Sequence, residues 1–443
     1  DHVVIATNKM ISELGDKNYK IEGIGLSYQM HGLVLVDKNH KVLYPSIIWC
    51  DSRAVKIGDQ AFNDLGETYC LSNCLNSPGN FTASKLKWVK DNLPELYDKV
   101  YKIMLPGDYI ALRLSGEINT TISGLSEGIF WDFKENDISD KLLNYYNLEK
   151  ELIADIVPTF GLQGKLTKSS AKELGLKPGI PIAYRAGDQP NNAFSLNVLN
   201  PGEVAATGGT SGVVYGITKK NTYDKKSRVN SFAHVNYTKD NQIKGVLLCL
   251  NGTGILYSWL KNEVMGGVNS YEKLNMLTAD ISVGSDDLIV LPFGNGAERI
   301  LENRDIKSHI MGINFNKHGR GHLIRAAQEG IAFSFKYGVE IMNEMGIDVN
   351  IVRVGNTNLF LSPLFREAFA NVCNTTIEVY NTDGAQGAAR GSGIGVGLYP
   401  TAKDAFPGFK KLRVLEPDTK LSEQYDYVYQ KWKMKLTVIL KEW

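Results

Sequence analysis

The sequence predicts an α/β protein with two domains and a cleft between them. Its 443 residues exceed the length at which one hydrophobic core keeps growing, which favours two domains. In both halves, strand-like apolar runs alternate with segments of helical periodicity, which is the pattern of α/β domains. We place the two domains at residues 1–196 and 197–443. Domains arranged in this way commonly close over a substrate.

The composition is that of an ordinary globular protein. Lys and Arg number 49 and Asp and Glu number 48, for a net charge of +1. A balance this even gives no reason to expect nucleic acid or a membrane surface as a partner. No apolar run approaches the roughly 18 to 20 residues of a membrane span, and the amino terminus lacks a signal-peptide pattern, so we expect a cytoplasmic protein. The five cysteines are scattered, and we expect reduced thiols rather than a zinc site.

The first half is expected to alternate short strands with helices. Its predicted elements, in order, are a helix at 4–14, a strand at 21–26, a hairpin of 33–36 and 42–44, a short strand at 47–49, a helical region from Asp51 to about 101, and a helix at 109–114.

Polar side chains follow two of these strands. Gln29, Met30 and His31 come after the first strand, and Asp51 and Arg53 come after the strand at 47–49, so all five are expected near sheet edges. Met30 and His31 can instead form a buried strand end, since Met fills gaps in cores. Asp51 and Arg53 can instead pair with each other at the surface.

Asp188 is expected at the carboxyl end of a strand. The apolar run 180–184 leads into Gly187 and Asp188, and open α/β sheets place their ligands at this end of their strands. This position suits a catalytic base. The alternative is a helix N-cap, because Asp before a helix accepts backbone N–H bonds.

A glycine-rich tip follows about twenty residues later. The run 203–206 ends in Thr207 to Gly212 and is followed by 213–215, which predicts a β-hairpin with a glycine tip. Such a tip lets backbone N–H groups and two hydroxyls approach an anion closely. An ordinary hairpin turn is the alternative.

The second half continues the alternation of strand and helix. Its last predicted helix is rich in small residues, Gly384 to Ala389, and can pack tightly against a neighbour. The other predicted elements are strands at 244–248, 288–291, 351–354 and 376–380 and helices at 254–262, 322–345 and 363–373, the small-residue helix spanning 384–397.

Several of these motifs, in this order, resemble the FGGY carbohydrate kinases, and among them most closely the xylulokinases. Gly187-Asp188-Gln189 occupies the place of the family's catalytic aspartate, and Thr207 to Gly212 that of its phosphate-binding hairpin, which favours the base over the cap for Asp188. The other similar segments are Gly25 to Gly32, Trp49 to Arg53, Thr82 to Asn92 (a signature that departs at Asn80) and Ser308 to Glu329 (a signature that departs at Gln328).

The resemblance implies two actin-like, ribonuclease H-like domains, the first binding a sugar and the second a nucleotide. It implies transfer of the γ-phosphate of ATP, with Mg²⁺, to the terminal hydroxyl of D-xylulose, and a possible homodimer. The implied sites are catalytic and metal-binding Asp188; substrate-binding Gln29, Met30, His31, Trp49 and Gln189; and nucleotide-binding Gly208, Gly209, Thr210, Gly312, Asn358, Ser362 and Gly384. For Trp49, core packing is the alternative to sugar contact. No Gly-x4-Gly-Lys-Ser/Thr loop occurs, which excludes the P-loop class.

Other functions remain open at this point. The substrate can be another pentulose or polyol, such as ribulose, gluconate or glycerol. Met30-His31 argues against glycerol, because the glycerol kinases carry an Arg-Glu pair at the resembling position. The protein can also be a non-catalytic sugar- or nucleotide-binding regulator of the same fold, or an assembly protein of the actin-like superfamily.

Two features depart from the family. Its adenosine motif is a short run of glycines and alanine after a strand, whereas Gly355 to Ser362 is two residues longer here. Family members also open with a strand-turn-strand carrying Asp-x-Gly-Thr, which supplies an aspartate near the metal. This sequence begins after that segment, so we expect roughly 40 to 50 residues to precede Asp1, at about 5 to 6 residues per strand.

Overall fold

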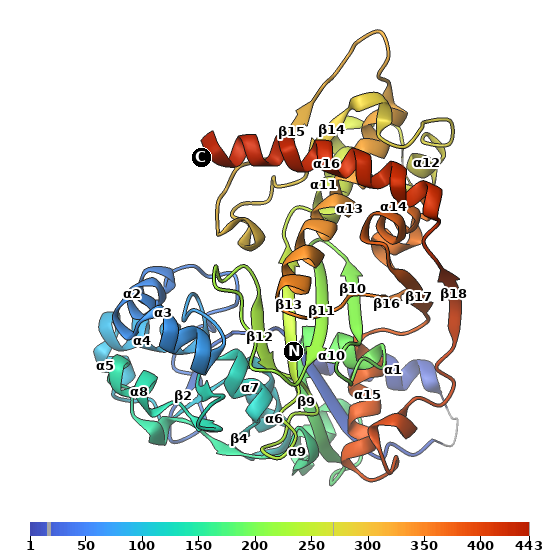
Figure 1. Cartoon of the computed structure of the whole chain (residues 1–443). Coiled ribbons are helices and arrows are strands. Elements are labelled where there is room, and N and C mark those ends of the chain that lie inside the picture. The colour runs from blue at the N-terminus through green and yellow to red at the C-terminus, as the bar shows by residue number, and fades with distance from the viewer. Residues whose placement is uncertain (16–18, 269, 443) are drawn as a thin grey trace.

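Two β-sheets organise the chain: a smaller one in the lower lobe of Figure 1 and a larger one in the upper lobe. The computed structural model describes residues 1–15, 19–268 and 270–442. In the smaller sheet, β1 (Ile24–Tyr28) runs parallel to β9 (Pro181–Gly187), and β8 (Phe160–Lys165) lies antiparallel on the other side of β9. The strand predicted at 21–26 is thus observed at 24–28, and the apolar run before Asp188 forms the central strand of this sheet.

The larger sheet has the strand order β12-β13-β11-β10-β16-β17-β18. β10 and β11 form the predicted hairpin, and β10, β16 and β17 run parallel. The predicted boundary at 196/197 falls in the connection between α10 and β10. The strands are β10 (Val204–Gly208), β11 (Gly212–Thr218), β12 (Asn230–Ala233), β13 (Lys244–Leu250), β16 (Ile351–Gly355), β17 (Thr376–Tyr380) and β18 (Lys411–Leu415).

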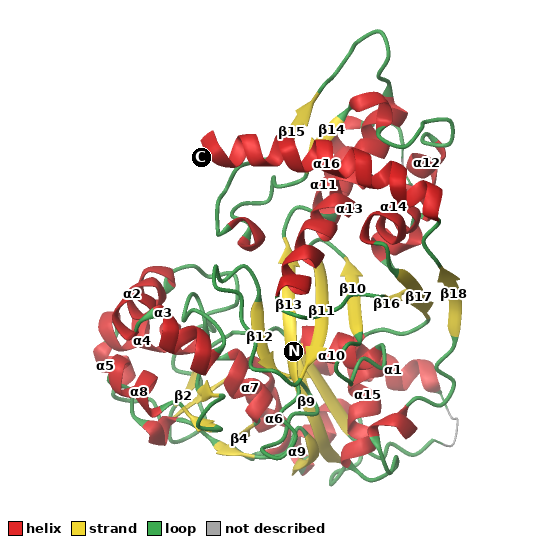
Figure 2. Cartoon of the chain, viewed as in Figure 1, coloured by secondary structure: helices red, strands yellow, loops and turns green. Residues whose placement is uncertain are grey.

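Helices cover these sheets, and the longest ones gather in the upper lobe (Figure 2). α14 and β17 have the predicted bounds. The helices are α1 (His2–Leu14), α2 (Val55–Leu65), α3 (Glu67–Tyr69), α4 (Thr82–Asn92), α5 (Pro94–Tyr97), α6 (Pro106–Ser115), α7 (Ile122–Glu127), α8 (Asp140–Tyr146), α9 (Lys168–Leu174), α10 (Asp188–Ser195), α11 (Gly254–Trp259), α12 (Tyr271–Met276), α13 (Arg320–Glu344), α14 (Pro363–Cys373), α15 (Gly384–Gly395) and α16 (Thr419–Glu442).

Short strand pairs complete the fold and correct one prediction. The hairpin predicted from 33–36 and 42–44 is only partly right. Its turn is closed by an antiparallel bridge between Val36 and Val42, and the amide of Leu43 donates to the carbonyl oxygen of Leu35. Residues 42–44 form no strand, however, and β2 (Val34–Val36) pairs with β3 (Lys102–Met104). All three residues of β2 are buried, so this strand needs a partner inside the lobe, and the partner comes from far along the chain. The remaining short strands are β4 (Asn119–Thr120), β5 (Trp131–Asp132), β6 (Asp137–Ile138), β7 (Asp155–Ile156), β14 (Ile289–Leu291) and β15 (His309–Met311).

Two further predictions are only partly right. The strand predicted at 47–49 reduces to one bridge between Ile47 and Leu33. The helical region from 51 to 101 divides into α2, α3, α4 and α5. Gly66 stops α2 at a φ of 87°, a conformation that glycine adopts without steric cost.

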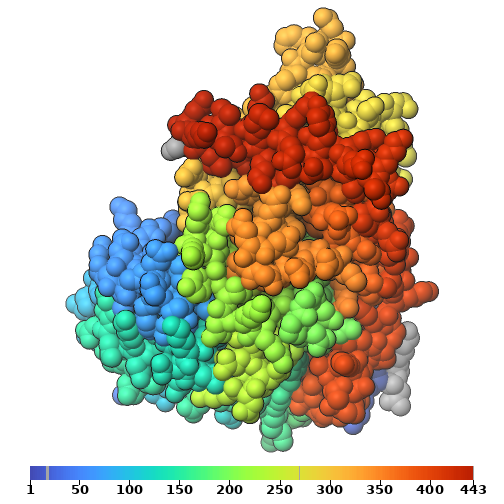
Figure 3. All heavy atoms as spheres, in the orientation of Figure 1, coloured from blue at the N-terminus to red at the C-terminus, as the bar shows by residue number. Residues whose placement is uncertain are grey.

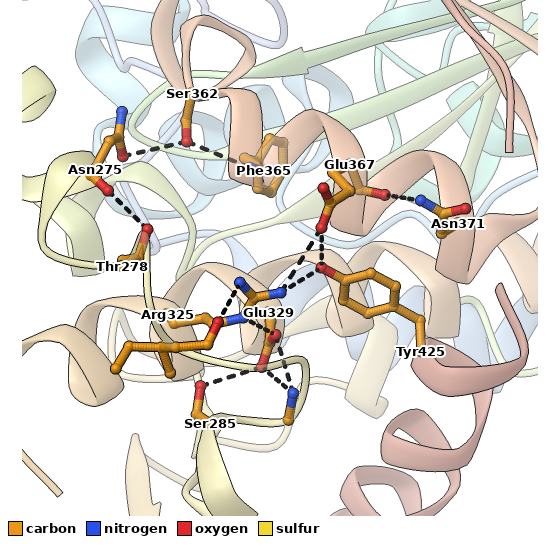
Figure 4. Close-up of polar contacts among 12 residues, drawn as sticks. Asn275, Thr278, Ser285, Arg325, Glu329, Ser362, Phe365, Glu367, Asn371 and Tyr425 are labelled. Atoms are coloured by element: carbon orange, nitrogen blue, oxygen red, sulfur yellow. Dashed lines mark hydrogen bonds and ion pairs between the residues drawn. The ribbon is translucent and has the colours of Figure 1, made fainter. Parts of the chain in front are cut away.

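A buried polar cluster joins α13 to α16, which runs across the surface of the upper lobe (Figure 3). The Arg325 guanidinium donates to Glu329, with Nε 2.7 Å from Oε1, and to the hydroxyl of Tyr425 at 3.0 Å (Figure 4). Glu329 also accepts from the amide of Gly284. Because both charged groups are buried, this pairing is what makes their burial tolerable.

The small-residue helix α15 packs tightly, as predicted, and it lies against the smaller sheet in the lower lobe (Figure 1). A Cβ on Gly391 would lie 2.5 Å from the ring of Tyr184 on β9, and a Cβ on Gly25 of β1 would lie 2.0 Å from the carbonyl oxygen of Ala388. α15 and β1 therefore contact each other directly through their backbones. Within the described residues, no helix has the length and apolar character needed to cross a bilayer.

We predict that Gly391→Ala destabilises the protein by about 1–3 kcal/mol, because the added methyl group overpacks a site that the buried ring of Tyr184 cannot vacate. The gain in helix propensity, about 0.5–1 kcal/mol, is smaller. Urea unfolding measures the change. Gly266→Ala is the matched control, since its Cβ would meet nothing within 4 Å. Equal stability of the two variants would contradict the tight packing of α15.

Candidate active site

Asp188 lies where β9 ends and α10 begins. Gly187 is the N-cap residue of α10 and Asp188 is its first residue, so the carboxylate is not occupied in capping. Its Oδ2 accepts a hydrogen bond of 3.0 Å from Nε2 of Gln189. Burial raises the pKa of Asp188 above the usual 3.8, against the opposing effect of the Gln189 hydrogen bond. A partly desolvated carboxylate at a strand end is a stronger base than one in water.

The register of the smaller sheet brings the Gln29–His31 segment to the same place. β1 and β9 are parallel, and Tyr28 pairs with Gly187 at their carboxyl ends. The next residue on each strand, Gln29 and Asp188, therefore starts at the same edge. Gly187 leaves no room for a side chain, because its Cβ would lie 2.6 Å from Cγ of Met30.

His31 is held with one ring nitrogen free. Its Nδ1 lies 2.7 Å from the carbonyl oxygen of Glu127, and since a carbonyl only accepts, Nδ1 carries the proton. Burial lowers the pKa of His31 to about 3, so the ring is neutral and Nε2 is an acceptor. Its backbone has a φ of 61°, a strained value for a non-glycine residue, and the buried Lys85 Nζ donates to its carbonyl oxygen at 2.9 Å.

In the segment 49–53, Trp49 lines the cleft, whereas Asp51 and Arg53 form an ion pair near the surface. Trp49 is 57% exposed and lines the cleft, so core packing does not explain it. Arg53 pairs with Asp51, its Nη2 2.7 Å from Oδ2, and stacks over the ring of Trp88. The alternative in which Asp51 and Arg53 pair with each other is the one observed.

The glycine hairpin faces this edge from the larger sheet. Gly208 pairs with Gly212 across the hairpin, and the tip is backed by the start of α11. The amide of Gly254 donates to the carbonyl oxygen of Gly209 at 3.1 Å, and the amide of Ile255 donates to that of Thr210 at 3.1 Å. A Cβ on Gly254 would lie 2.1 Å from the Gly209 oxygen, so this contact requires glycine.

A buried carboxylate fixes the loop before α11. Glu298 accepts from the amides of Asn251 and Gly252, both at 2.9 Å, and burial raises its pKa to about 7. Sequence reasoning missed Glu298, since nothing local ties it to a loop 46 residues earlier. It also missed Asn192, which lines the cleft one helical turn after Asp188 and which helical spacing would have indicated.

Two adjoining cavities collect most of the predicted residues. A cleft of about 720 Å³ is lined by Gln29, Met30, His31, Trp49, Asp188, Gln189, Gly209, Asn358 and Gly384. A second cavity of about 430 Å³ is lined by Gly208, Gly209, Thr210, Asn358 and Ser362. Gly209 and Asn358 border both cavities. Gly312 lines neither: it follows β15 with a φ of 84°, packed against the backbone of Asp287, and this turn accounts for the glycine.

Comparisons with known proteins place the chain in a family. The sequence profile of the FGGY family of carbohydrate kinases, N-terminal domain, matches residues 1–195, and that of its C-terminal domain matches residues 204–394. A xylulose kinase of Lactococcus lactis is 26% identical over 95% of this chain and 83% of its own length. A xylulose kinase of Bacillus subtilis is 27% identical over 93% of this chain and 82% of its own.

Solved structures agree on the fold. A xyloylose kinase from Brucella ovis superposes with a TM-score of 0.86 at 24% identity, covering 98% of this chain and 88% of that one. The Plasmodium falciparum glycerol kinase with ADP gives the same TM-score at 19% identity, over 98% of this chain and 88% of that one. These likenesses confirm the predicted fold of two actin-like α/β domains. Since both domain profiles match, together spanning most of its length, the chain belongs to the FGGY family of carbohydrate kinases.

Proposed function

We propose that this carbohydrate kinase transfers the γ-phosphate of ATP to the terminal hydroxyl of D-xylulose. The observation that carries the proposal is the position of Asp188, whose carboxylate lines the same cleft as Gln29, Met30 and His31 and as the glycine tip at Gly209. The sequence relatives that cover most of this chain are named xylulose kinases, and the cleft supports a small polyhydroxylated substrate beside a phosphate-binding turn.

Asp188 is proposed to accept the proton of the attacking hydroxyl. As the hydroxyl oxygen bonds to the γ-phosphorus, the bond from that phosphorus to the bridging oxygen of ADP breaks, and the hydroxyl proton passes to the carboxylate. Desolvation favours this role, because it raises the pKa of Asp188 and so strengthens the base.

The sugar is proposed to lie against the lower lobe. Nε2 of His31 accepts from a sugar hydroxyl, since Nδ1 is already engaged with the Glu127 carbonyl. The exposed ring of Trp49 offers a flat apolar surface to the carbon face of the sugar. Gln189 is held by Asp188 through its Nε2, which leaves its amide oxygen as a further acceptor.

The phosphates are proposed to lie at the glycine tip, with Gly208, Gly209 and Thr210 as backbone donors. We infer that Mg²⁺ is the divalent ion. Among the described residues, no group of three or more His, Cys, Asp or Glu side chains is placed to hold a metal ion, so we propose that the phosphates carry the ion and that Asp188 contributes a carboxylate to it. When bound, the ion would neutralise phosphate charge.

The substrate assignment is tested with a panel of D-xylulose, D-ribulose, gluconate and glycerol in a coupled ADP-release assay. We expect D-xylulose to give the highest kcat/KM, because the relatives that cover most of this chain are named xylulose kinases. Gluconate should be a poor substrate, because the neutral His31 and the apolar Met30 offer no positive charge for its carboxylate. A higher kcat/KM for any of the other three would overturn the assignment while leaving the kinase activity in place.

Asp188→Asn is expected to lower kcat by about 10²–10⁴-fold, the range that general-base catalysis contributes, and to leave sugar binding measurable by calorimetry.

Because burial disfavours the ionised carboxylate, the neutral amide should also make the fold slightly more stable at pH 7. That gain should disappear as the pH falls through the raised pKa towards 3.8. Wild-type kcat/KM for the sugar should likewise fall on acidification, at a pH above 3.8. Undiminished turnover in the variant would remove Asp188 from this role.

His31→Ala is expected to raise the KM for the sugar about 5- to 10-fold, as expected for the loss of one hydrogen bond and some packing, with the KM for ATP unchanged. Because the pKa of His31 lies near 3, its ring does not titrate between pH 5 and 8, so the wild-type KM for the sugar should show no histidine step in that range. Steady-state kinetics with each substrate varied in turn makes the measurement. An equal rise in both KM values would contradict a specific sugar contact.

A further inference from the structure

The second cavity has both apolar and polar lining residues. Ile255, Leu361 and Tyr271 line it and are substantially exposed, at 36%, 56% and 43%. The glycine tip and the polar side chain of Asn275 on α12 line it as well. A flat aromatic base attached to phosphates has this distribution of polarity.

Asn275 is held by a hydrogen-bond network that engages the oxygen of its side-chain amide and leaves the nitrogen free of hydrogen bonds to the described residues. Its Oδ1 lies 2.6 Å from the hydroxyl of Tyr257 and 3.1 Å from Nε2 of Gln328. Gln328 is fully buried and is the residue at which the chain departs from the family signature. Its Oε1 in turn accepts from Ser362 Oγ at 2.6 Å. Figure 4 shows the nitrogen of Asn275 directed away from Ser362.

The network places the oxygen of each amide against a donor. The hydroxyl of Tyr257 donates to Oδ1 of Asn275 at 2.6 Å, and the hydroxyl of Ser362 donates to Oε1 of Gln328 at 2.6 Å. Nε2 of Gln328 also donates to Oδ1 of Asn275, at 3.1 Å. With Oδ1 taken up, Nδ2 of Asn275 is left as a donor, and no hydrogen bond from it is found among the described residues.

We propose that Asn275 Nδ2 donates a hydrogen bond to a ring nitrogen of the purine base of the nucleotide, and that Gln328, Tyr257 and Ser362 set its orientation. This inference rests on the proposed use of ATP. A lone donor at this position selects for an unprotonated ring nitrogen and does not read the exocyclic amino group of adenine. Gln328 is thereby a positioning residue, which gives a physical reason for a polar side chain where the family usually has an apolar one.

The test uses Asn275→Asp, which keeps the shape and the oxygen facing the network but replaces the donor with an acceptor. We expect the KM for ATP and the calorimetric Kd for ADP to rise about 3- to 10-fold, the effect of one hydrogen bond, with kcat and the sugar KM unchanged. Asn144→Asp, on the exposed face of α8, makes the same charge change far from both cavities and should alter neither value.

Base analogues identify the contact. Wild-type protein should use purine riboside triphosphate, which lacks the amino group, about as well as ATP. Among 1-deaza-, 3-deaza- and 7-deaza-ATP, one should lose about 3- to 10-fold in wild type and nothing further in Asn275→Asp. Gln328→Leu should raise the KM for ATP and blunt this discrimination while leaving the sugar KM unchanged.

An ADP Kd in Asn275→Asp within twofold of wild type, or equal losses for every deaza analogue in both proteins, would overturn the role of Asn275. If the wild type phosphorylates none of the sugars, the proposed function fails, whereas the ADP titration still decides the role of Asn275.

Discussion

The parallel register between β1 and β9 is the constraint on which the site depends. It aligns Tyr28 with Gly187, so that the two strands end together and release Gln29 and Asp188 at one edge. A shift of one residue would turn every side chain of the shifted strand to the other face of the sheet. α15 packs against β1 so closely that Gly25 has no room for a Cβ, and this contact supports the register.

The upper lobe contributes to the site mainly with backbone groups of the glycine tip and not with charged side chains. The glycine tip between β10 and β11 is supported by the amides of Gly254 and Ile255, and the loop before them is fixed by the buried carboxylate of Glu298. α15 packs on the smaller sheet and on α10, and Gly384 at its start lines the cleft.

Local patterns in the sequence predict much of this arrangement. The apolar run before Asp188 is a strand, the glycine tip is a hairpin, and α14 and β17 have the predicted bounds, because each is encoded by a continuous pattern of apolar residues and turn residues. The pairing of β2 with β3 is not predictable in this way, since the partners lie far apart in the chain. The orientation of Asn275 depends on three residues from three other elements, and no spacing rule reveals such a network. Gly312 remains a prediction: it lines neither cavity, and a turn with a φ of 84° is enough to account for the glycine.

The most direct measurement of the central idea is the structure of a ternary complex of the kinase with D-xylulose and a non-hydrolysable ATP analogue. A carboxylate oxygen of Asp188 should lie about 2.6–3.2 Å from the terminal hydroxyl oxygen of the sugar, with that oxygen in line with the γ-phosphorus. A sugar bound with its terminal hydroxyl out of reach of Asp188, and next to another side chain or exposed to solvent, would contradict the proposed mechanism.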